Sequence, residues 1–135
     1  MRGVVLLLAL STIGCNLTGP DDDLSGTWVA RSIGHASFVG FTLRQTGDAI
    51  SGTACATSES VLLYSGAAVT GDYPDLRFTV AAGNTAPCCA QLAGTRFIGK
   101  RDSTKDIVGN YGTFDLRFER SEASLCENLP QARKP

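Results

Sequence analysis

Residues 114–120 of the chain read Phe-Asp-Leu-Arg-Phe-Glu-Arg, and this run decides the fold class. Apolar and charged side chains alternate in it, so that Phe114, Leu116 and Phe118 face one side of an extended chain. A period of two predicts a β-strand with one buried face. The pattern Asp-Leu-Arg-Phe also occurs at residues 75–78, which predicts a second strand of the same kind upstream.

Turn-forming residues, chiefly Gly, Asp and Pro, divide the rest of the chain from residue 24 onward into short alternating runs. Apart from a short turn within residues 122–128, no stretch has a helical period. The predicted strands are 26–32, 39–45, 49–56, 62–70, 75–81, 91–101, 106–110 and 113–120.

The connections between these strands all resemble hairpins, with no long crossover. Consecutive antiparallel strands hide their edges most directly when the sheet closes on itself. The sequence therefore predicts an all-β fold, an eight-stranded antiparallel up-and-down (meander) barrel. A two-sheet sandwich is the alternative.

The composition of the 135-residue chain predicts one domain and excludes several functions. Twelve basic residues nearly balance thirteen acidic ones without forming a basic stripe, so no nucleic-acid partner is expected. A single His removes most routes to a His-based catalytic triad or a multi-His metal site. No phosphate-binding loop or metal-ligand motif is present, so the chain is expected to be no enzyme and to hold no cofactor or metal.

The first fourteen residues are typical of a secretory signal peptide. Arg2 precedes an apolar run at residues 4–10 that is too short to span a membrane, and small residues follow up to Cys15. This ending resembles the lipobox of bacterial lipoproteins, from which Thr12 departs because Leu, Val or Ile is usual there. An ordinary secretory signal followed by an unrelated Cys is the alternative.

The lipobox resemblance implies cleavage after residue 14 and lipidation of Cys15. Two or three acyl chains would anchor the protein firmly in a membrane, and residues 15–23 would form a polar tether. The expected location is the cell envelope, either at the outer membrane facing the periplasm or at the cell surface. Asn16 after the lipidated Cys favours the outer membrane.

The four cysteines other than Cys15 form an even set, as expected of an exported domain with two disulfides: Cys55, Cys88, Cys89 and Cys126. Adjacent cysteines rarely bridge each other, so Cys55 is expected to pair with one member of the Cys88-Cys89 pair and Cys126 with the other. This pairing requires residues 121–126 to run back along the barrel wall. A redox or metal site at Cys88-Cys89 is the alternative.

Gly26-Thr27-Trp28 resembles the Gly-x-Trp motif that opens the barrels of the calycin group, which includes the lipocalins and avidins. Arg120 resembles the lipocalin arginine that packs across this Trp. The resemblance covers residues 24–120 and implies a structural Trp28–Arg120 pair at one end of the barrel. The expected barrel domain spans residues 24–126, and residues 127–135 are expected to form a flexible tail. Alternatively, Arg120 faces solvent. The chain has one Trp, so the biotin site of avidins is absent.

The predicted core consists of residues with inward parity: Trp28, Val39, Phe41, Leu43, Ile50, Leu76, Phe78, Val80, Phe114, Leu116 and Phe118. Small residues on the third, fourth and sixth strands predict a void at the open end, with a mouth lined by His35, Phe38, Tyr64 and Arg96. A barrel of this size either fills with its own side chains or holds one small ligand.

The sequence therefore predicts a lipid-anchored binding module of the cell envelope, with a small apolar ligand in the barrel. The alternative is a protein-interaction or protease-inhibitor barrel that binds an envelope protein through its rim or wall.

Replacement of Cys15 by Ser tests the predicted anchor. We expect Cys15→Ser to abolish incorporation of labelled palmitate and to release the protein from the membrane fraction. Unchanged labelling of the variant would contradict lipidation at this residue.

Overall fold

The computed structural model describes residues 23–30, 37–103, 105–127 and 129–131. The predictions for the signal peptide, Cys15, most of the tether, His35 and residues 132–135 fall outside the described residues.

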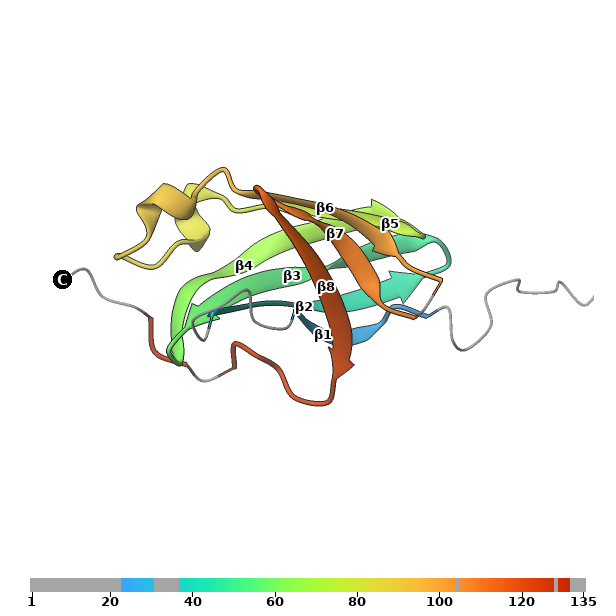
Figure 1. The fold of residues 1–135 in the computed structure, drawn as a ribbon, viewed down its shortest axis with the longest axis horizontal. Helices are drawn as coiled ribbons and strands as arrows, with labels where there is room; N and C mark the ends of the chain where they lie inside the picture. The colour runs from blue at the N-terminus through green and yellow to red at the C-terminus, as the bar shows by residue number, and fades with distance from the viewer. Residues whose placement is uncertain (1–22, 31–36, 104, 128, 132–135) are drawn as a thin grey trace, which may run out of the picture.

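Eight antiparallel strands form one closed barrel in which each strand pairs with its neighbours in sequence and β1 pairs with β8 (Figure 1). The predicted meander barrel is therefore confirmed. The strands are β1 (Gly26–Ala30), β2 (Ser37–Thr46), β3 (Ala49–Ser58), β4 (Val61–Asp72), β5 (Asp75–Thr79), β6 (Arg96–Arg101), β7 (Ile107–Tyr111) and β8 (Phe114–Ser121).

The main departure from the predicted strands lies between β5 and β6. Residues expected to begin the sixth strand form a 3₁₀ turn instead, η3 (Ala90–Leu92), which follows another short turn, η2 (Ala82–Asn84). The ladder between β4 and β5 is short, which leaves the first half of β4 free to pair elsewhere. The Ala86 amide bonds the Leu63 carbonyl at 2.8 Å, so this loop covers β4 instead of extending β6.

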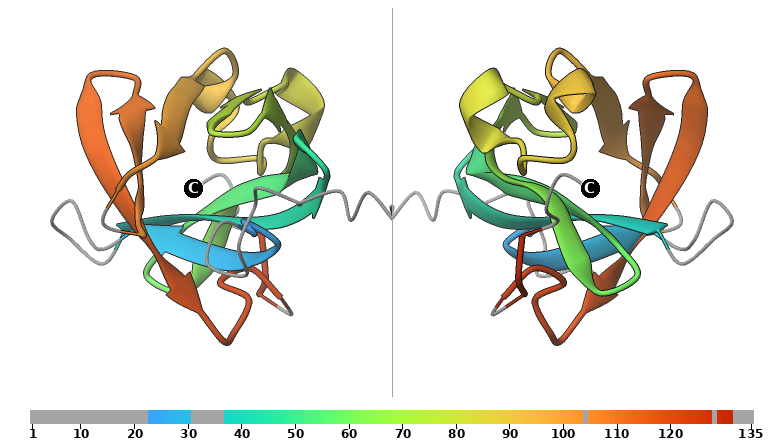
Figure 2. Two further views of the ribbon diagram at one scale, coloured as in Figure 1. Left: turned by 90° about the vertical axis from the view of Figure 1, so that its right-hand side faces the viewer. Right: turned by 90° about the vertical axis from the view of Figure 1, so that its left-hand side faces the viewer.

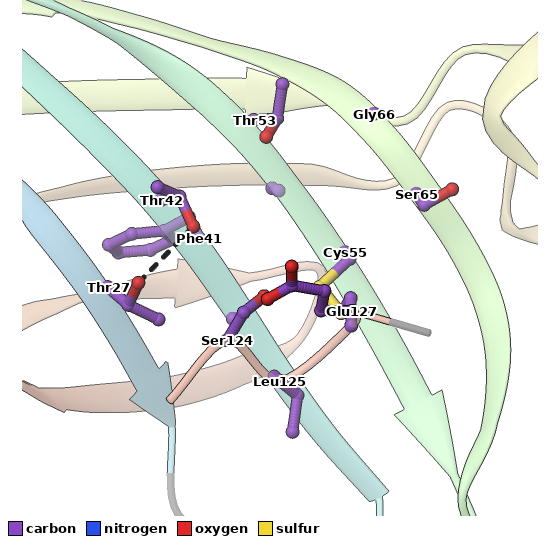
Figure 3. Close-up of a pocket in the computed structure, with 13 residues that line it drawn as sticks. Thr27, Phe41, Thr42, Thr53, Cys55, Ser65, Gly66, Ser124, Leu125 and Glu127 are labelled. Carbon is purple, nitrogen blue, oxygen red and sulfur yellow. Dashed lines mark hydrogen bonds between the residues drawn. A yellow bond between two sulfur atoms is a disulfide. The ribbon is translucent and has the colours of Figure 1, made fainter. Parts of the chain in front are cut away.

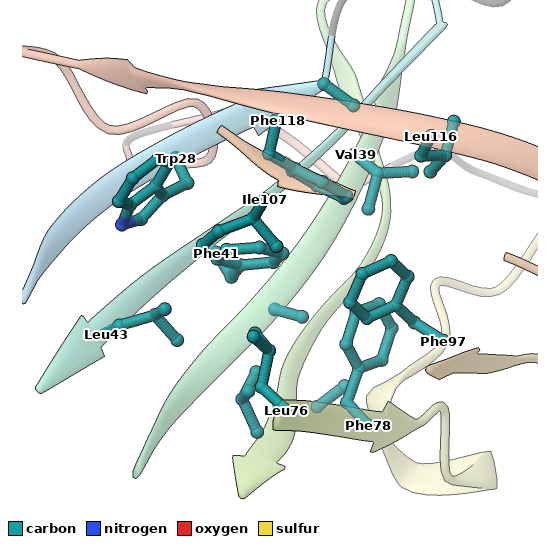
Figure 4. Close-up of a cluster of buried hydrophobic side chains, with 14 of the residues drawn as sticks. Trp28, Val39, Phe41, Leu43, Leu76, Phe78, Phe97, Ile107, Leu116 and Phe118 are labelled. Carbon is teal, nitrogen blue, oxygen red and sulfur yellow. The ribbon is translucent and has the colours of Figure 1, made fainter. Parts of the chain in front are cut away.

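The barrel interior is a cluster of apolar side chains centred on phenylalanine rings (Figure 4). Every predicted core residue is buried except Phe114, which is 53% exposed, so that prediction was wrong. Phe114 has inward parity but pairs with Tyr111 at the last rung of the β7–β8 hairpin, beyond the end of the packed interior. Phe97, which was not predicted, is fully buried.

A pair of glycines makes room for the Phe97 ring. Gly99 on β6 and Gly109 on β7 are register partners. A Cβ atom on Gly109 would lie 2.7 Å from Cε2 of Phe97 and 2.6 Å from the Gly99 Cα. Because real Cβ atoms do not approach so closely, glycine at this position lets the ring lie against the backbone.

Trp28 closes one end of the barrel. It is fully buried, and its indole Nε1 donates a hydrogen bond to the Leu24 carbonyl at 2.9 Å. The Arg120 guanidinium lies over the indole at 4.6 Å from the ring centroid, which confirms the predicted contact. Its two terminal nitrogens also donate to the carbonyls of Asp23 and Ser25, so Arg120 ties the incoming chain to the last strand.

Arg120→Ala should destabilise the barrel by about 1–2 kcal/mol, because it removes a cation–π contact and hydrogen bonds to two carbonyls. Urea unfolding followed by Trp28 fluorescence measures this loss. Arg117→Ala, on the same strand, is the matched control. Its ion pairs with Asp102 and Asp106 lie on the exposed outer wall, so its effect should be smaller. Equal effects would contradict a special role for Arg120.

Candidate functional site

The open end of the barrel lies opposite Trp28 and carries the longest described loop. Turns at residues 59–60 and 112–113 and the loop at residues 80–95 surround this end (Figure 2). The η2–η3 loop is held to β4 by backbone pairing between Tyr64 and Thr85. It is therefore fixed on the barrel at both its ends and near its middle.

The structure separates the residues predicted to line the mouth. Tyr64 points inward and is 1% exposed. Phe38 immediately precedes inward-facing Val39, so alternation places it on the outer side of β2. Arg96 is exposed because it precedes inward-facing Phe97 in the same way. His35 lies outside the described residues.

Aromatic rings occupy the middle of the barrel. The ring centroids of Phe41 and Phe118 are 4.3 Å apart, those of Phe97 and Phe118 5.2 Å, and those of Phe78 and Phe97 5.4 Å. These are packing distances for aromatic pairs. Small residues such as Ala54 belong to the same buried cluster, so they face large rings across the barrel. The described interior is thus filled largely by its own side chains.

Among the described residues, the Tyr64 hydroxyl is a polar group of the interior that makes no hydrogen bond of normal geometry. Its oxygen is buried, and its ring lies 6.5 Å from that of Phe78. Burial raises the pKa of Tyr64 well above its usual value, and the nearby Tyr111 hydroxyl raises it further. The pKa of Tyr111 is also raised by burial. This neutral hydroxyl can donate to or accept from a polar atom that enters from the open end.

The disulfides join Cys55 to Cys126 and Cys88 to Cys89, so the predicted pairing was wrong. Cys55 lies between inward-facing Ala54 and Ala56, which directs it to the outer wall, away from the open-end loop. The segment after β8 runs along this outer wall and brings Cys126 to it. The backbone pairing of the η2–η3 loop with β4 keeps Cys88 and Cys89 at the rim, where they bridge each other.

The segment after β8 is called the strap and comprises residues 122–127 and 129–131. It runs back along the wall, as predicted for residues 121–126. It continues beyond residue 126, the predicted end of the barrel domain, because the Leu62 amide bonds the Pro130 carbonyl at 2.8 Å. Gln131 also forms a parallel bridge with Leu62.

The rim of the open end exposes an aromatic side chain. Phe114 projects at the tip of the β7–β8 hairpin, above half-buried Tyr111. An exposed aromatic ring on a rigid hairpin is a typical anchor in a protein interface. The only other large apolar side chain exposed among the described residues is Ile98, on the outer face of β6.

The described residues show no feature of a metal centre or a membrane helix. They include no cluster of three or more His, Cys, Asp or Glu side chains suited to a metal ion. No helix within them is long and apolar enough to cross a bilayer. Comparisons with protein-family models, curated proteins and solved structures find no match.

Tyr64→Phe tests whether the buried hydroxyl lacks a partner. At pH 7 the variant should match the parent within about 1 kcal/mol, because no strong hydrogen bond is lost. In the unfolded chain tyrosine ionises near pH 10, whereas burial keeps Tyr64 neutral in the folded state. This contribution to stability is therefore complete below about pH 10 and is lost as the pH rises above it.

Urea unfolding at a series of pH values should accordingly show a shallower alkaline loss of stability for Tyr64→Phe than for the parent. A large destabilisation at pH 7 would instead reveal a hydrogen bond that holds the hydroxyl.

Proposed function

We propose that the chain is an exported, lipid-anchored barrel that binds another protein of the cell envelope through its open end. The observation that carries this proposal is Phe114, which is 53% exposed at the rim although its strand parity is inward. Burying such a ring against a partner contributes about 1.5–3 kcal/mol of hydrophobic free energy. Isolated apolar residues are common on surfaces, so the position of this one on a rigid hairpin is what favours a binding role.

The filled interior supports an interaction through the rim over transport of a ligand. The centroids of neighbouring phenylalanine rings at the centre lie 4.3–5.4 Å apart, so these side chains occupy the middle of the barrel. A carrier for an apolar ligand would have to displace these rings.

The rigidity of the loop at the rim also favours protein recognition. The Ala86–Leu63 hydrogen bond holds the η2–η3 loop beside the barrel mouth, and the Cys88–Cys89 disulfide restricts the backbone of the loop between its two 3₁₀ turns. A loop fixed before binding loses little conformational entropy when it meets a partner. Small periplasmic protease-inhibitor barrels provide a precedent, by analogy of fold alone.

A photocrosslinking amino acid placed at position 114 tests the proposal in the native envelope. We expect one stoichiometric crosslinked partner, which mass spectrometry would identify. The matched control carries the same crosslinker at Thr46, which is exposed in the β2–β3 hairpin at the closed end. Phe114→Ser should weaken binding of the purified partner by at least about tenfold, given the area lost.

The same adduct from positions 114 and 46, or none from position 114, would exclude recognition through the open end. In either case the Cys15→Ser experiment still tests the anchor separately.

A second candidate function is supported by the Tyr64 hydroxyl. A small, mainly apolar ligand with one polar atom could satisfy this hydroxyl from the open end. Native mass spectrometry of protein purified from its own envelope would then show a bound mass that Tyr64→Phe loses. Absence of any adduct in the parent would exclude this candidate.

A further inference from the structure

The strap and the outer wall enclose a groove that is separate from the open end. Strands β1 to β4 form its floor, and residues 124–127 of the strap overhang it (Figure 3). Its volume is about 200 Å³. This is smaller than a site for a drug-sized molecule, which occupies roughly 300–1,000 Å³. The space therefore suits a ligand of about one ring.

Three threonines cross the floor in one row. Thr27 on β1 is the register partner of Thr42 on β2, which in turn is the partner of Thr53 on β3. All three alternate with inward-facing residues, so their side chains point outward into the groove. The Oγ1 atoms of Thr27 and Thr42 are 3.5 Å apart (Figure 3). Each threonine offers a hydroxyl and a methyl group.

The other polar groups of the groove are also hydroxyls, apart from one carboxylate. Ser65 lies on the far side of the floor, and Ser124 and Glu127 belong to the overhanging strap. None of the described residues that line the groove is basic. The lining therefore offers donors and acceptors to a neutral partner, whereas an anion would meet a carboxylate and no cation.

The groove is formed before any ligand arrives. The Cys55–Cys126 disulfide links its floor covalently to the strap. Leu125 packs directly on the backbone of β2, since a Cβ atom on Gly40 would lie 3.1 Å from Leu125 Cδ2. On β4, Gly66 lines the far side of the floor with a φ of +72°, next to an irregular part of the β3–β4 ladder. Such pre-organisation lowers the entropic cost of binding.

We propose that this groove binds one neutral sugar unit of a glycan. A sugar ring presents C–H groups on its faces and hydroxyls around its edge. The threonine methyls and Leu125 provide apolar contacts for a face, and the threonine hydroxyls and Glu127 provide hydrogen-bond partners for the edge. The groove differs from the open end in every residue, so it does not depend on the proposed interaction with a protein.

Titration of the isotope-labelled full-length protein with glucose and with N-acetylglucosamine tests the proposal by NMR. We expect saturable shifts confined to the amides of the threonine row and the strap, at millimolar sugar. Thr42→Val keeps the shape of the side chain and removes its hydroxyl. It should weaken binding by about 2- to 10-fold, the value of one hydrogen bond.

Thr70→Val is the matched control. Thr70 is exposed on the outer face of β4 and does not line the groove. This variant should bind sugar as the parent does. The spectrum of each variant also reports whether it is folded.

Three results would overturn the proposal. The first is the absence of saturable shifts with either sugar, and the second is equal binding by the parent and Thr42→Val. The third is a response to the diamine putrescine alone that Glu127→Gln removes, which would identify a site for organic cations. None of these results bears on crosslinking from position 114, so the two proposals fail separately.

Discussion

The antiparallel pairing of β1 with β8 closes the sheet, and the rest of the barrel depends on it. This pairing places Arg120 opposite Trp28, where the guanidinium covers the buried indole and bonds the carbonyls of the incoming chain. One side chain thus links the first strand, the last strand and the segment that seals this end. Closure gives each of the eight described strands two neighbours, which protects the sheet from pairing edge to edge with another chain.

The division of the barrel into a sealed end and an open end separates stability from recognition. The sealed end uses its polar groups internally, as the indole bond to Leu24 shows. The open end and the outer wall instead present groups that the fold does not require. These are the exposed Phe114 ring at the rim and the threonine row beneath the strap. A rigid scaffold that carries its variable features on loops and outer faces is a common arrangement in binding proteins.

Alternation in the sequence predicted the strands and most of the core, because parity decides which face a side chain occupies. Parity does not show how far along the barrel axis a residue lies. Phe114 was therefore wrongly placed in the core, although it lies at the rim beyond the packed interior. Phe97 was missed because Ile98, its apolar neighbour, faces outward and Gly99 has no side chain at the next inward position, so the alternation is obscured. The burial of Phe97 also depends on a glycine contributed by another strand. Phe38 and Arg96 were wrongly predicted to line the mouth. Each lies one position before an inward-facing residue, Val39 and Phe97 respectively, and therefore faces outward. The cysteine pairing depends on the part of the outer wall that the strap reaches. This is a property of the tertiary structure, and the spacing of cysteines in the sequence does not determine it.

The nesting of the disulfides has a consequence for biogenesis. The Cys88–Cys89 bridge lies within the chain segment that Cys55 and Cys126 enclose. A chain that emerges N-terminus first presents Cys55 to an oxidant well before Cys126, and Cys88 is the next thiol to arrive. Oxidation of these four thiols in order of appearance would therefore trap Cys55 with the wrong partner. Correct maturation calls for either early closure of the adjacent pair or a thiol isomerase that reshuffles the first bridge.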